Sequence, residues 1–460
     1  MSSSHGEGNT QSGPGAVDSD GATGGNAGRE GAGGRRAGHR AARSASGTPE
    51  ARSHEAGGRG ETRGAAPAPA SSFPLTSALL LVGVFFLTFL GRTILSPLLL
   101  AVEAELGVSH ATAGSFFFVI SAGLVVTMLG SGFVSQRLSH HATTALSVAV
   151  VGAGLLVLSL TESLVLFRVG LVLLGAGAGL YLPSGIATLT DVTPGEQWGR
   201  ALALHELGPI LGLTAGPLLA ELAFRFIGWR TVLLGLGVLC LVMAVVFARF
   251  GRGGRFHGAP PSWAALRDVV RHKRFWVIAF FFIMAIALEL GVYSMLPTYL
   301  VVDRGMNQSL VNSVVSTSRL TSLLMVFAAG WLADRFGARR VVAAVALTSG
   351  VVTVIIGLAN GGLLIAAVYL QPMLISAFFP AGLSALAAVS SAARRNLAVS
   401  VVIPLAYLFG AGLVPAVLGR LAEAEAFGTG FIAVGALMAA GVVLAPGMAG
   451  RPRTRHNRDR

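Results

Sequence analysis

Three ionisable side chains lie inside long apolar stretches of the sequence. Arg92 falls in the stretch 76–100, Glu289 in 275–300 and Arg319 in 311–333. A charge at the middle of a membrane costs at least about 2.5 kcal/mol, so a charge retained there indicates a function. A guanidinium can bind an anionic group through two parallel hydrogen bonds, and a carboxylate can take up and release a proton. The three residues therefore predict a site for an anion and a coupling proton.

A structural interpretation of the same charges is also open. Glu289 and Arg319 could neutralise each other as an ion pair, while Arg92 reaches the outer interface. Tyr293 and Gln371 are polar residues in apolar stretches, and each could contact a substrate or only hydrogen-bond a neighbouring helix. We take Glu289 as the candidate proton carrier. The candidate substrate contacts are Arg92, Arg319, Tyr293 and Gln371.

Membrane-spanning helices are the elements that must position these residues. The 460 residues are 53% hydrophobic and only 12% charged, with a mean hydropathy of +0.70, which excludes an ordinary soluble enzyme. A helix needs about 20 apolar residues to cross the hydrocarbon core. We expect twelve such helices, and hence an all-α, polytopic membrane protein. Their predicted spans are 76–100, 113–135, 142–160, 164–188, 201–224, 229–249, 275–300, 311–333, 341–359, 362–389, 397–419 and 427–447.

A basic segment at 250–274 divides the twelve predicted helices six and six. Residues 1–72 are rich in glycine, serine and arginine and carry no apolar periodicity, so we expect a disordered cytoplasmic tail. The predicted domains are this tail, a six-helix bundle at 73–249, the linker at 250–274, a second six-helix bundle at 275–449 and a basic tail at 450–460.

The basic residues indicate the orientation. With the N-terminus in the cytoplasm, 19 arginines and lysines of the bundles, linker and C-terminal tail fall on the inner side and four on the outer side, as the positive-inside rule requires. The sequence thus predicts a multi-pass protein of the cell membrane with both termini cytoplasmic, and its composition indicates a bacterial source. Because the net charge of +13 is spread in short runs between apolar stretches, we expect contact with lipid and no nucleic acid.

One loop sequence occurs twice, about 198 residues apart. After the eighth predicted helix the chain reads GWLADRFGARR, and a weaker copy follows the second predicted helix. Glycine lets helices approach closely, an acid at a helix end can pair with a cation, and arginines hold the loop at the cytoplasmic surface. The candidate gate residues are Gly330, Asp334, Arg335, Gly337, Arg339 and Arg340, with Gly132 and Arg137 in the first copy.

This loop resembles the signature G-x-x-x-D-R-x-G-R-R of the major facilitator superfamily. The second copy matches it, whereas the first has Gln136 in place of the acid and Ser139 in place of the second glycine. The resemblance implies two pseudo-symmetric six-helix bundles, a cavity lined by helices 1 and 7, and an acid that latches the cytoplasmic gate. With the offset of 198, Arg92 corresponds to position 290, next to Glu289.

The predicted function is secondary active transport of a small solute by alternating access, coupled to protons, with an organic anion as the substrate. Drug or metabolite efflux is the alternative, and it rests on a glycine and proline pattern in the fifth predicted helix. A non-transporting receptor or scaffold of the same fold is the alternative from another class. The sequence contains no Walker phosphate-binding run. We expect a monomer that is not an enzyme and that has neither metal nor cofactor.

Overall fold

The computed structural model describes residues 74–259, 267, 270–389 and 392–448. The predicted N-terminal tail, the C-terminal tail and part of the predicted linker lie outside the described residues. The described residues all belong to one compact unit. In the described part of the chain, every regular element is a helix.

The N-terminal half, as we call residues 75–250, contains the first six predicted spans. The first span is interrupted between α1 and α2, and the fifth between α6 and α7. The elements are α1 (Leu75–Thr93), α2 (Leu95–Leu106), α3 (His110–Leu138), α4 (His140–Leu160), α5 (Leu164–Val192), α6 (Trp198–His205), α7 (Leu207–Leu222), a π-helical turn η2 (Ala223–Ile227) and α8 (Trp229–Phe250).

The C-terminal half, residues 273–448, contains the other six spans. Its seventh and eleventh spans each include a π-helical turn, η3 and η4. The elements are α10 (Lys273–Ile286), η3 (Ala287–Gly291), α11 (Val292–Val302), α12 (Gln308–Phe336), α13 (Ala338–Leu358), α14 (Gly361–Ser376), α15 (Phe378–Val389), α16 (Ala392–Ala406), η4 (Tyr407–Leu413), α17 (Val414–Glu423), α18 (Phe427–Ala440) and η5 (Gly441–Met448).

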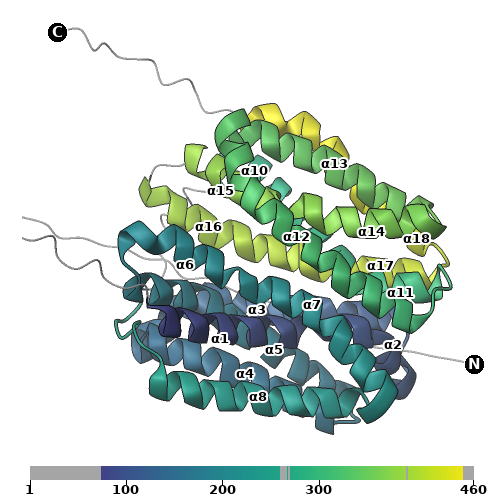
Figure 1. The fold of residues 1–460 in the computed structure, drawn as a ribbon, viewed down its shortest axis with the longest axis horizontal. Coiled ribbons are helices and arrows are strands. Elements are labelled where there is room, and N and C mark those ends of the chain that lie inside the picture. The colour runs from purple at the N-terminus through teal and green to yellow at the C-terminus, as the bar shows by residue number, and fades with distance from the viewer. Residues whose placement is uncertain (1–73, 260–266, 268–269, 390–391, 449–460) are drawn as a thin grey trace, which may run out of the picture. The chain divides into compact units, whose positions relative to one another are not determined.

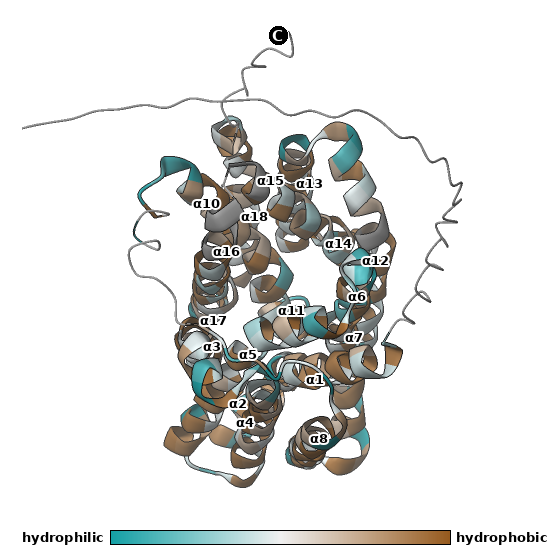
Figure 2. Ribbon diagram, turned by 90° about the vertical axis from the view of Figure 1, so that its left-hand side faces the viewer, coloured by the Kyte–Doolittle hydropathy of each residue, from teal (hydrophilic) through white to brown (hydrophobic). Residues whose placement is uncertain are grey.

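The predicted fold class is confirmed. Eleven helical stretches are long and apolar enough to cross a membrane, and the pair Gln308–Met325 and Ala328–Phe336, bent by 45°, makes a twelfth if it is one span. Figure 1 shows these helices running side by side, with α1 to α8 in one group and α10 to α18 in the other. Figure 2 views the same helices nearly end-on, with α2, α4 and α8 below, α10, α13 and α15 above, and most of the ribbon hydrophobic.

Hydrogen bonds join the two halves at one end of the helices. We call it the predicted outer end, because it carries the turns at 107–109, 228, 303–307 and 424–426. There Glu221 of α7 accepts hydrogen bonds from Ser309 and Asn312 of α12, and Glu423 of α17 accepts one from the backbone N–H of Ala111. In the described part of the chain, the bonds between the halves run from mid-membrane to this end, so the protein is closed on that side.

The two copies of the repeated loop share one unusual backbone conformation. Gly337 has φ 87° and ψ 134°, and Ser139, 198 residues earlier, has φ 75° and ψ 160°. Such positive φ values favour glycine, so the second copy carries the residue that its geometry requires. Ser139 adopts the same conformation with a side chain, which is a strained state. The loops therefore correspond in structure although the first departs from the signature.

Replacing the strained serine should stabilise the protein. We expect Ser139→Gly to raise the free energy of unfolding by about 1 kcal/mol, because glycine tolerates this φ and ψ. The lost side-chain cap, a 3.4 Å hydrogen bond from the N–H of Ala142, costs only a few tenths of a kcal/mol when glycine replaces serine. Thermal unfolding in detergent measures the change. Ser139→Ala loses the cap and keeps the strain, so it should be less stable than wild type, and a Gly variant below wild type would contradict the expectation.

The second loop copy differs in part from its predicted packing. Among the described residues, a Cβ added to Gly330 would meet nothing within 4 Å, so no close helix approach is seen at this glycine in this conformation. Asp334, Arg339 and Arg340 are exposed, and Arg335 lies over the ring of Trp331 at 5.6 Å. Among residues whose side chains are described, Asp334 has no ion-pair partner.

Candidate functional site

Two π-helical turns form the centre of the candidate site. Turn η3 carries Glu289, and turn η4 begins at Tyr407. The turns pack backbone to backbone, since a Cβ on Gly291 would lie 2.3 Å from the carbonyl oxygen of Gly410 and a Cβ on Gly410 would lie 2.6 Å from the nitrogen of Ala287. Single π-helical turns are rare and occur frequently at functional sites. This packing fixes the positions of both side chains, which come from spans far apart in sequence.

Glu289 and Arg319 form an ion pair inside the C-terminal half. Nη1 of Arg319 lies 3.3 Å from Oε1 of Glu289 and 3.5 Å from its carbonyl oxygen. The arginine is buried and the glutamate is 16% exposed. Among the described residues, Oε2 of Glu289 and Nε of Arg319 are buried without a hydrogen-bond partner. A buried ion pair with unmet hydrogen bonds is costly. The site therefore has one hydrogen-bond acceptor and one donor that no described protein group uses.

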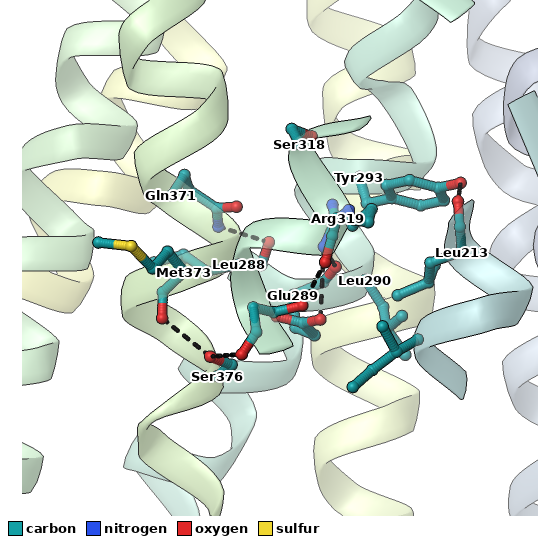
Figure 3. Close-up of polar contacts among 12 residues, drawn as sticks. Leu213, Leu288, Glu289, Leu290, Tyr293, Ser318, Arg319, Gln371, Met373 and Ser376 are labelled. Carbon is teal, nitrogen blue, oxygen red and sulfur yellow. Dashed lines mark hydrogen bonds and ion pairs between the residues drawn. The ribbon is translucent and has the colours of Figure 1, made fainter. Parts of the chain in front are cut away.

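Tyr293 and Gln371 lie on either side of this ion pair (Figure 3). The guanidinium carbon of Arg319 lies 4.3 Å from the centre of the Tyr293 ring, and the Tyr293 hydroxyl donates to the carbonyl of Leu213 in the N-terminal half at 3.0 Å. Gln371 donates to the carbonyl of Leu288 at 2.9 Å. Gln371 therefore supports the turn that presents Glu289, and the Tyr293 ring faces Arg319, the partner of that glutamate. Tyr293 also connects it to the opposite half.

Arg92 makes its contacts elsewhere, between the halves. Its Nη2 donates to the hydroxyl of Tyr407 at 3.1 Å. Its guanidinium carbon lies 4.2 Å from the centre of the Phe89 ring and 4.7 Å from that of Tyr407. Only 8% of Arg92 is exposed, so this cation is held inside the protein by two aromatic rings. In the described structure no hydrogen bond or ion pair joins it to Glu289.

A small pocket lies beside Arg92. Its polar lining consists of Arg92, Thr88 and Tyr407. The hydroxyl of Thr88 donates back to the carbonyl of Val84 in its own helix. The apolar lining comes from α1, α3 and α5 and consists of Phe85, Phe89, Leu124, Met128, Ala178 and Leu182. The pocket thus combines one cation with a mostly apolar wall.

The structure brings together four of the five residues proposed from sequence. Glu289, Arg319, Tyr293 and Gln371 surround turn η3, whereas Arg92 lies in the pocket with Tyr407. The repeat offset that set Arg92 beside Glu289 describes equivalent places in two helices, not a contact. Sequence reasoning missed the aromatic and methionine lining, because such residues are ordinary packing residues in an apolar helix. A tyrosine in an apolar stretch was the one available signal for Tyr407.

No group of three or more histidine, cysteine, aspartate or glutamate side chains could hold a metal ion in the described part of the chain. The ionisable groups of the candidate site are two arginines, a glutamate and two tyrosines. These groups can bind an anion and exchange a proton.

The sequence was also compared with known proteins. The family model described as Major Facilitator Superfamily matches residues 81–318 and 291–460 in two overlapping matches. The chain belongs to the major facilitator superfamily. This confirms the predicted family, and the chain is accordingly a membrane transporter of the superfamily.

Several superfamily members resemble the chain at low identity. The 4-hydroxybenzoate transporter PcaK of Pseudomonas putida is 23% identical over 403 residues, which cover 79% of this chain and 88% of the relative. The multidrug resistance protein MdtL of Escherichia coli is 28% identical over 155 residues, covering 32% of this chain and 38% of MdtL. A solved structure of a bacterial homolog to human lysosomal transporter Spinster, inward-facing and occupied, has a TM-score of 0.70 at 16% identity and covers 82% of this chain and 97% of its own. The last likeness supports the fold alone.

Proposed function

We propose that the protein couples the movement of a small organic anion to the movement of a proton. Arg92 binds the anion in the pocket between the halves, and Glu289 carries the proton. The observation that carries this proposal is the incomplete ion pair of Glu289 and Arg319, with one buried oxygen and one buried nitrogen unpartnered among the described residues. If the ion pair had only a structural role, hydrogen bonds to these two atoms would make the protein more stable.

The proton step follows from the exchange of partners. When Glu289 is ionised, it pairs with Arg319, as in the structure. When Glu289 takes up a proton, the pair weakens and Arg319 becomes free to attract an anion. Turns η3 and η4 pack against each other through Gly291 and Gly410, so a shift at Glu289 reaches Tyr407 and thereby Arg92. The two sites are linked through a short, rigid path.

The relatives support an organic anion over a cationic drug. PcaK is named for 4-hydroxybenzoate, which carries a carboxylate, and its match covers most of both chains. MdtL supports the efflux alternative, but its match covers about a third of this chain. A cation would also meet the buried guanidinium of Arg92 in the pocket, where like charges repel. We therefore place organic anion transport first and drug efflux second.

Proteoliposomes with an imposed pH gradient test the proposal. With the lumen alkaline, wild type should accumulate one of a pool of labelled small organic anions, by up to about tenfold per pH unit for each proton coupled. Glu289→Gln should still exchange the anion but should lose the accumulation. Glu162→Gln, an exposed carboxylate in a loop, is the matched control and should behave as wild type. Accumulation by Glu289→Gln equal to wild type would show that Glu289 carries no proton.

A further inference from the structure

We infer that the pocket beside Arg92 binds an aromatic monocarboxylate, an anion with one carboxylate on a flat apolar ring. The inference rests on the proposed function and names the substrate class for the same protein. It follows from the charge of the pocket, from its apolar lining and from the aromatic rings beside Arg92, each of which disfavours other classes of organic anion.

The charge of the pocket fits one negative charge. Among the described lining residues, Arg92 is the only one that is charged at neutral pH, and none carries a carboxylate. The guanidinium uses one N–H for the hydrogen bond to Tyr407 among described residues, so further donors remain for the two oxygens of a carboxylate. A second carboxylate would have to lie against apolar side chains without a partner, which is costly. The pocket therefore favours monoanions over dianions.

The lining excludes a polyhydroxylated acid. Six of the nine lining residues are apolar, and the hydroxyl of Thr88 already donates to a backbone carbonyl. Each sugar hydroxyl left without a partner there would cost about 1–3 kcal/mol. The apolar part of an anion loses no hydrogen bonds when it enters the pocket, and its burial is favourable in free energy. The body of the anion is therefore hydrocarbon.

The shape of the pocket favours a flat ring. The rings of Phe89 and Tyr407 lie 4.2 Å and 4.7 Å from the guanidinium carbon of Arg92, and Phe85 continues the aromatic wall one turn before Phe89. Offset or edge-to-face contacts with aromatic rings stabilise another ring. The aromatic side chains that line the pocket therefore favour an aromatic ring next to the carboxylate.

The chain direction gives the orientation of the ligand. Arg92 lies past the middle of the first span, whereas Phe85, Met128 and Leu182 lie nearer to the predicted cytoplasmic end of their helices. The carboxylate thus binds at mid-membrane and the ring extends toward the predicted cytoplasmic end. A small apolar group opposite the carboxylate would meet Met128 and Leu182. We expect 4-methylbenzoate to bind at least as well as benzoate.

Equilibrium binding of radiolabelled benzoate to the purified full-length protein in nanodiscs tests the inference. Unlabelled 4-methylbenzoate should displace the label, whereas terephthalate, gluconate and benzylamine should each need at least about tenfold higher concentration. These competitors differ from benzoate by a second carboxylate, by hydroxyls in place of the ring, and by the sign of the charge. Arg92→Gln should weaken binding at least about tenfold, a loss of roughly 1.4 kcal/mol.

A pair of tryptophan variants locates the site. Met128→Trp fills the pocket and should abolish benzoate binding. Val126→Trp places the same side chain on the same helix at a position 71% exposed on the outside of the bundle, and it should bind benzoate as wild type does. Size-exclusion profiles and thermal unfolding check that both variants are folded. Benzoate binding by folded Met128→Trp equal to wild type would overturn the inference.

The outcomes separate this inference from the proposed function. If benzoate does not bind while another organic anion accumulates with the pH gradient and requires Glu289, the aromatic class is wrong and proton-coupled anion transport stands. If benzoate binds with the Arg92 and Met128 dependence but no gradient drives its movement, the binding site stands and the proton coupling is wrong.

Discussion

Arg319→Gln is expected to destabilise the protein by about 3 kcal/mol, because it leaves the carboxylate of Glu289 inside the bundle without its charge partner. The two side chains lie 3.3 Å apart, and the arginine is buried. The double variant Glu289→Gln/Arg319→Gln is expected to regain most of the loss, since two amides of similar size leave no unpaired charge. Thermal and denaturant-induced unfolding of detergent-solubilised protein measures the four members of this cycle.

The matched control is Arg168→Gln. Arg168 is an exposed arginine on α5, and surface substitutions usually change the free energy of unfolding by no more than about 0.5 kcal/mol. If the double variant is as unstable as the sum of the two single variants, Glu289 and Arg319 are not energetically coupled. The double variant also separates stability from transport, because it should regain its fold and still fail to accumulate the anion along the pH gradient.

Gly175→Ala is expected to prevent correct packing of the N-terminal half, with a loss of about 3 kcal/mol or more. A Cβ on Gly175 of α5 would lie 1.9 Å from the carbonyl oxygen of Ile120 in α3. The opposing atom belongs to the backbone, so no side-chain rotation relieves the clash and the two helices must separate. A Cβ on Gly179, one turn later, would likewise lie 2.2 Å from the carbonyl oxygen of Leu124.

The comparison is with a glycine in open space. A Cβ on Gly235 of α8 would meet nothing within 4 Å, so Gly235→Ala should be as stable as wild type or up to about 1 kcal/mol more stable through its higher helix propensity. The yield of monodisperse protein on size exclusion and the midpoint of thermal unfolding measure both variants. Equal yield and midpoint for the two would show that α3 and α5 do not approach as closely as the structure has them.

The number and places of the spans could be predicted from sequence because they depend on a local property. A run of about 20 apolar residues spans a membrane wherever it occurs, and the predicted spans 76–100 and 229–249 correspond to Leu75–Leu106 and Trp229–Phe250. The repeat could also be predicted, because the loop motif recurs at an offset of 198 residues. In the structure the same offset relates Ser139 to Gly337, and both residues have a positive φ. The orientation in the membrane stays a prediction.

The partners of the charged residues could not be predicted in the same way. They depend on how each helix is rotated against its neighbours, and a hydropathy pattern carries little of that information in a helix that is apolar on all sides. The π-helical turns at Glu289 and Tyr407 change this rotation locally, and they are packed together by Gly291 and Gly410 from different spans. Nothing within either span indicates the contact.

By itself, the sequence determined a twelve-helix membrane transporter of two related halves and the residue types available for anion and proton chemistry, because hydrophobic length and buried charge act residue by residue. The tertiary structure alone decided that Arg319 pairs with Glu289 inside one half while Arg92 reaches Tyr407 across the halves. It also decided that phenylalanine and methionine side chains complete a pocket beside Arg92. These are contacts between distant segments, and they exist only once the helices have packed.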